Sequence, residues 1–96
     1  MSSKDRDIEA IKTFCKQFQQ FCDSVTEDAN KLKNMAYYAE GSLKDQVGRG
    51  VTQKVVEFSD ELIQIVDQGM EPVRELERKA IQMEEDMERI QSELER

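Results

Sequence analysis

The stretch AEGSLKDQVGRGV, residues 39–51, contains three of the four glycines of this 96-residue chain. Gly41 stands where a glycine commonly follows the last turn of a helix in the left-handed conformation. Gly48 and Gly50 add conformational freedom that lets the backbone reverse its direction. Because helix-favouring sequence of similar length flanks the stretch on both sides, we predict a turn over residues 41–50 that joins two long helices.

Apolar residues recur at alternating spacings of three and four on both sides of this turn, a pattern typical of helices that pack along one seam. The first predicted helix covers about residues 5–40 and the second about residues 51–95. The seam of the first helix is Ile8, Ile11, Cys15, Phe18, Cys22, Val25, Ala29, Leu32, Ala36 and Ala39. The seam of the second begins with Val51, Val55, Phe58, Leu62, Ile65 and Gly69, and resumes with Val73, Leu76, Ala80, Met83, Met87, Ile90 and Leu94. The sequence thus predicts an all-α fold, an antiparallel two-helix hairpin in a single domain over residues 1–96.

The second helix carries an irregularity at Gly69–Pro72. The step from Gly69 to Val73 inserts four residues into the heptad repeat, which is a stutter. Pro72 lacks an N–H group and crowds the preceding turn, at a cost of about 3 kcal/mol inside a helix. Two outcomes are open at this point: a kink in one continuous helix, or a break that starts a separate helix near Pro72.

Further apolar residues lie outside the seam. They form two columns at heptad spacing: Phe14, Phe21 and Met35 on the first helix, and Val56, Ile63 and Met70 on the second, with Val66 nearby. Burial of one such side chain contributes about 1.5–3 kcal/mol, and two helices alone have little core. We therefore predict that these residues bind a partner and that the hairpin pairs into a four-helix bundle, as a homodimer or with another helical protein. The alternative is that the two helices splay and bury these additional apolar residues against each other, without a partner.

The charge distribution excludes several classes of partner. The net charge is −7, and residues 51–96 carry 6 basic and 13 acidic side chains, whereas residues 1–50 carry 8 of each. Such a surface repels phosphates and anionic lipid headgroups, so we expect no nucleic-acid ligand. No apolar run approaches the roughly 20 residues of a membrane span, and residues 1–7 do not resemble a signal peptide. We expect a cytoplasmic protein that the classical secretory route does not export.

The residues that enzymes and metal sites use are scarce. The chain has no histidine, and Cys15 and Cys22 lie two helical turns apart, about 10 Å, too far for a disulfide with each other. We predict that both are small buried side chains, with an intermolecular disulfide as the alternative. The acidic residues around Glu84 point in several directions on a helix and do not converge as a cation site requires. We therefore predict no enzymatic activity, no cofactor and no metal site.

Two long helices around a central glycine-bearing turn, in a chain of this length, resemble the WXG superfamily, the ESAT-like proteins of type VII secretion. Locally the resemblance rests on Tyr38-Ala-Glu-Gly-Ser42, on Phe58-Ser-Asp-Glu-Leu62 and on the region of Pro72. Members of this superfamily are antiparallel helical hairpins that pair into four-helix bundles, and some escort larger effectors to the secretion machine. The resemblance implies the same architecture for this chain.

The chain also departs from the superfamily. The usual Trp-x-Gly turn motif is absent because there is no tryptophan; Gly50 matches the glycine of the motif, and Leu43 or Val47 supplies its apolar side chain. The export signal, an aromatic residue followed four positions later by an acid, is also absent. The resemblance is therefore to the Trp-less accessory members, and it implies a small partner or targeting chaperone of a type VII effector or sister hairpin. A homo-oligomeric coiled-coil subunit of an unrelated assembly is the alternative.

Overall fold

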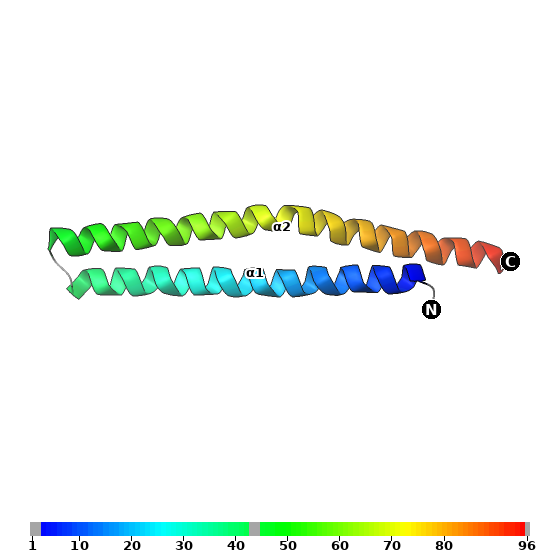
Figure 1. The fold of residues 1–96 in the computed structure, drawn as a ribbon, viewed down its shortest axis with the longest axis horizontal. Coiled ribbons are helices and arrows are strands. Elements are labelled where there is room, and N and C mark those ends of the chain that lie inside the picture. Colours follow the sequence, from blue (N-terminus) through cyan, green and yellow to red (C-terminus); the bar gives the residue numbers. More distant parts are fainter. Residues whose placement is uncertain (1–2, 43–44, 96) are drawn as a thin grey trace. The chain divides into compact units, whose positions relative to one another are not determined.

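The computed structural model describes residues 3–42 and 45–95, and almost all of them are helical. The two helices are α1 (Ser3–Ser42) and α2 (Gln46–Leu94) (Figure 1). Side-chain contacts connect α1 to α2, so the helices pack on each other and do not stand alone. The prediction of an all-α helical hairpin is confirmed.

The contacts within these helices divide into two compact units. The terminal unit comprises Met1–Gln20 and Met70–Arg96, and the turn unit comprises Phe21–Gly69. Each unit contains one segment of α1 and one segment of α2. In the terminal unit Lys12 bonds to Glu84, and the later residue Cys15 bonds to the earlier residue Val73, so the two segments run antiparallel. The single domain over residues 1–96 stays a prediction.

The connection between the helices is shorter than the predicted turn over residues 41–50. Gly41 lies within α1, and both Gly48 and Gly50 lie within the first turns of α2. No residue in the described ranges, glycine included, has a positive φ angle, so Gly41 does not adopt the expected left-handed conformation. The prediction of a turn is confirmed in its place but is wrong in its extent.

Asp45 explains why α2 starts before the glycines. Its Oδ1 accepts a 2.6 Å hydrogen bond from the N–H of Gly48, and its carbonyl oxygen accepts a 3.1 Å bond from the N–H of Arg49. A side-chain bond to the N–H three positions into a helix is the geometry of an N-cap. Ser42 ends α1, and Asp45 is the cap of α2.

Replacing Gly69 by alanine is expected to stabilise the protein by about 1 kcal/mol. Gly69 is helical, and a Cβ atom added there meets nothing within 4 Å. Alanine therefore introduces no clash, and it reduces the conformational entropy of the unfolded chain. The same reasoning applies to Gly50, which is also helical and unobstructed. Urea denaturation of both variants measures the change; lower stability in either one contradicts a helical glycine at that position.

The core follows one buried column on each helix, at heptad spacing. On α1 the column is Ile8, Cys15, Cys22, Ala29 and Ala36, all of which belong to the predicted seam. On α2 it is Thr52, Ser59, Val66, Val73, Ala80 and Met87, of which Val66 and Met87 are half-buried. Most of these side chains are small, and small side chains at the contact allow two helices to approach closely.

The seam predicted for α2 in the turn unit is wrong at three of its six residues; the other three, Val55, Leu62 and Gly69, are half-buried. Val51, Phe58 and Ile65 are 57%, 57% and 63% exposed. The residues that follow the first two, Thr52 and Ser59, are buried in their place. The hydroxyl of Ser59 donates a 2.9 Å hydrogen bond to the carbonyl of Val55 one turn earlier, which satisfies the polar group inside the core. A polar residue therefore occupies a position that the pattern of apolar residues assigned to the surface.

The irregularity at Gly69–Pro72 does not interrupt the helix. α2 is one helix with Pro72 inside it, so the alternative of a break and a separate helix is excluded. The expected stutter is also absent, because the buried column keeps its spacing of seven through Val66 and Val73.

Candidate protein-interaction surface

The turn unit has two different sides, which the buried columns define. Residues one and four positions after a buried residue lie on one side of a helix, and residues one before and three after it lie on the other. Lys33 donates a 2.7 Å hydrogen bond to Oδ1 of Asp60. Lys33 stands four positions after the buried Ala29, and Asp60 stands one position after the buried Ser59. Because this ion pair joins α1 to α2, the corresponding sides of the two helices coincide. We call this the ion-pair side.

The opposite side of the turn unit is apolar. Six exposed large side chains lie there: Phe21, Leu32 and Met35 from α1, and Val51, Phe58 and Ile65 from α2. Each stands one before or three after a residue of the buried column, and their exposed fractions range from 37% to 67%. We call these six residues the outer apolar face.

The outer apolar face is large for a protein of this size. An aromatic side chain buries about 150–250 Å² and an aliphatic one less, so six that are about half exposed leave on the order of 500 Å² uncovered. The largest apolar patch on a typical monomer is about 300–600 Å², and a stable interface covers about 800 Å² on each partner. The face therefore has the dimensions of a protein-binding surface.

The terminal unit also exposes apolar side chains. On α1, Phe14 is 52% exposed and its ring centroid lies 6.0 Å from that of Phe18, with an interplanar angle of 34°. On α2, three exposed apolar residues each stand three positions after a member of the buried column: Leu76, Met83 and Ile90. Ile81 is also exposed, but it stands one position after Ala80, on the ion-pair side. The two sides of this unit are therefore less clearly separated than those of the turn unit.

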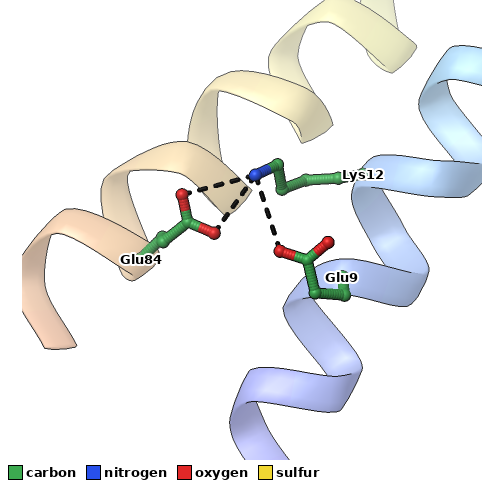
Figure 2. A network of polar contacts seen from close by, with 3 residues as sticks. All are labelled: Glu9, Lys12 and Glu84. Carbon is green, nitrogen blue, oxygen red and sulfur yellow. Dashed lines mark hydrogen bonds and ion pairs between the residues drawn. The ribbon is translucent and has the colours of Figure 1, made fainter. Parts of the chain in front are cut away.

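Lys12 joins the two helices on the ion-pair side of the terminal unit. Its Nζ lies 3.3 and 3.1 Å from the two carboxylate oxygens of Glu84 on α2, and 3.6 Å from Oε1 of Glu9 on its own helix (Figure 2). The hydrogen bond and the charge of Glu84, with a smaller effect of Glu9, raise the pKa of Lys12 above its usual 10.5. Such solvated pairs stabilise a fold only weakly, but they restrict which residues of the two helices face each other.

The structure divides the predicted partner-binding residues into two groups. The three on α1 are exposed: Phe14, Phe21 and Met35. On α2, Met70 is only 6% exposed, and Val56, Ile63 and Val66 are half-buried. The prediction that these residues lie outside is therefore wrong for Met70, and Val56, Ile63 and Val66 are less exposed than it implied. Val51, Phe58 and Ile65 on α2 are exposed, but they were assigned to the seam because they continue a regular repeat of large apolar residues. Binding by either group stays a prediction.

The residues predicted to shape the turn have separate positions. Gly48 is buried, and its N–H is the donor to the capping Asp45. Val47 is 76% exposed, so it does not fill an apolar pocket in the turn as the resemblance implied. Leu43 lies outside the described residues.

Cys15 and Cys22 are both free and buried, which confirms their prediction as small core residues. The thiol of Cys15 donates to the carbonyl of Val73, with 3.7 Å between Sγ and the oxygen. Burial, with a smaller effect of the negative charge of Glu77, raises the pKa of the Cys15 thiol above 9.0.

The stability of the protein is expected to fall as the pH rises above about 9. In the unfolded chain Cys15 ionises near 9.0, whereas the folded protein holds it protonated to higher pH. The raised pKa therefore contributes to the free energy of unfolding. This contribution is complete below pH 9.0 and is lost as the pH rises through the raised pKa. Urea midpoints measured from about pH 7 to pH 10 for the wild type and for Cys15→Ala test the cause. The variant should lose less stability above pH 9.0; parallel curves would contradict the assignment to Cys15.

Within residues 3–42 and 45–95, no group of three or more His, Cys, Asp or Glu side chains is arranged to hold a metal ion. Neither helix in these ranges is long and apolar enough to cross a membrane. Comparison with protein families, curated proteins and solved structures finds no match to this chain.

Proposed function

We propose that this protein is a non-enzymatic binding partner that docks a second helical protein on its outer apolar face and so completes a helical bundle. The setting we propose is type VII secretion, with the N-terminal helical domain of an effector or a sister hairpin as the partner. The setting rests on the resemblance to the accessory members of the WXG superfamily, and the binding role rests on the surface itself.

The observation that carries the binding role is the arrangement of side chains in the turn unit. The seam between α1 and α2 uses small residues such as Ala29 and Ser59, while large residues such as Phe21 and Phe58 stay exposed. Each large apolar side chain that a partner covers contributes about 1.5–3 kcal/mol. A partner that covers the outer apolar face therefore adds apolar burial that the seam of small residues does not supply.

The second candidate is a homo-oligomer in which another copy of the chain covers the outer apolar face. The exposed charges beside that face favour it: Asp28 and Lys31 on α1, and Lys54 and Glu61 on α2, two acidic and two basic side chains. A border with balanced charges can meet its own copy without net repulsion, in spite of the acidic charge of the whole chain.

Light scattering coupled to size-exclusion chromatography tests the proposed function and separates the two candidates. The chain is run alone and after co-expression with the helical protein encoded beside it. A stoichiometric complex of the two proteins supports the proposed partner role, and a stable homodimer that no co-expressed protein alters supports the second candidate. A folded monomer under both conditions refutes the binding role of the outer apolar face.

A further inference from the structure

The terminal unit contains a groove between α1 and α2 with a volume of about 550 Å³. Its apolar part is formed by Ile8 on α1 and by Met87, Ile90 and Leu94 on α2. Ile8 is buried at the bottom, whereas Ile90 and Leu94 are 52% and 81% exposed. The groove therefore has an accessible apolar floor of Met87, Ile90 and Leu94, which lies above the buried Ile8.

Four carboxylates line the same groove. Asp5 and Glu9 stand one helical turn apart on α1, and Glu84 and Glu88 stand one helical turn apart on α2. Lys12 bonds to Glu9 and Glu84, so one positive charge faces three glutamates when Glu88 is included, which leaves these three with an excess of negative charge. The groove thus has an acidic residue pair on each helix beside its apolar floor.

We propose that this groove binds a basic amphipathic helix of a partner protein. A helix laid between two others presents apolar side chains at spacings of three and four to a floor such as that of Met87, Ile90 and Leu94. Lysine and arginine side chains beside that stripe keep their charged ends in water and reach carboxylates on both borders. Neither a free metal ion nor a purely apolar ligand uses both features, because the first needs no floor and the second needs no charge.

The groove shares no residue with the outer apolar face, whose six residues all belong to the turn unit. Its three glutamates stand on the ion-pair side of the terminal unit, whereas Ile90 stands three positions after Met87, on the other side. The proposal therefore does not depend on the proposed function, and a Phe58→Glu variant, altered only on the outer apolar face, should keep the groove intact.

The test uses the full-length protein and a fluorescent synthetic peptide of leucine and lysine arranged with the leucines on one helical face. A second peptide has the same composition in scrambled order, so it has the same charge but no apolar stripe. Fluorescence anisotropy should show that the patterned peptide binds about tenfold more tightly than the scrambled one. Moderate salt should weaken the binding of the patterned peptide relative to low salt. Equal binding of the two peptides, or no binding of the patterned one, overturns the proposal.

Variants locate the binding. Glu88→Lys reverses a negative charge of the groove, and Ile90→Ser removes part of its apolar floor. Each substitution should weaken the binding of the patterned peptide by about tenfold. Both residues are exposed, so circular dichroism should show unchanged helix content. The matched control is Glu57→Lys, the same change of charge on an exposed helical position of the turn unit. If Glu57→Lys weakens binding as much as Glu88→Lys, or if Ile90→Ser has no effect, the attraction is general and the groove is not the site.

Discussion

Replacing Phe58 by glutamate is expected to abolish association through the outer apolar face while the two helices stay folded. Phe58 is 57% exposed in the hairpin, so its own fold loses little when the ring is removed, under about 1 kcal/mol. In a bundle the same position is covered, and the variant loses the burial of an aromatic ring and places a carboxylate in an apolar contact. Together these effects exceed about 3 kcal/mol, which is more than a hundredfold in the dissociation constant.

The experiment compares helix content by circular dichroism with molecular mass by light scattering. Gln64→Glu is the matched control, because Gln64 is exposed and stands five positions after the buried Ser59, on the outward surface of α2. That variant adds the same charge and should associate as the wild type does. If Phe58→Glu unfolds the protein, Phe58 belongs to the seam between the helices. If it associates at the wild-type affinity, the partner binds elsewhere.

The helices themselves could be predicted from the sequence because they depend on local properties. A long 3–4 repeat without helix-breaking residues predicts α1, and strong helix formers predict the second half of α2. The boundaries near the turn could not be predicted from the glycines alone. Glycine permits a turn but does not require one, and the side chain of Asp45, by bonding to the N–H of Gly48, starts α2 before Gly48 and Gly50.

The face of α2 that packs on α1 could not be predicted from apolar residues alone. In the turn unit, a repeat of large apolar residues that includes Phe58 lies beside a repeat that includes Thr52 and Ser59. The first repeat is the more hydrophobic of the two, so the sequence favours it as the seam. The structure buries the second, because small side chains let the helices approach and the Ser59 hydroxyl is satisfied by the carbonyl of Val55. A pattern of apolar residues identifies a surface that another helix covers. It does not indicate whether that helix belongs to the same chain or to a partner.

Replacing Ser59 by leucine is therefore expected to destabilise the hairpin. Ser59 has no exposed surface, and it belongs to the buried column of the turn unit with Ala29 and Ala36 from α1. Leucine at this position forces the helices apart or forces strained rotamers, at a cost of about 2–3 kcal/mol. For a chain of this length the melting temperature should fall by roughly 10–20 °C.

Thermal denaturation followed by circular dichroism measures the change, with Ser24→Leu as the matched control. Ser24 is an exposed helical residue of α1, so the same substitution there should alter stability by less than about 0.5 kcal/mol. The result decides between the two ways in which α2 can face α1. With Ser59 inside, added volume is a steric penalty; with Phe58 inside, Ser59 faces water and leucine is tolerated. A Ser59→Leu protein that melts at or above the wild-type temperature would place Phe58 in the seam and remove it from the surface available to a partner.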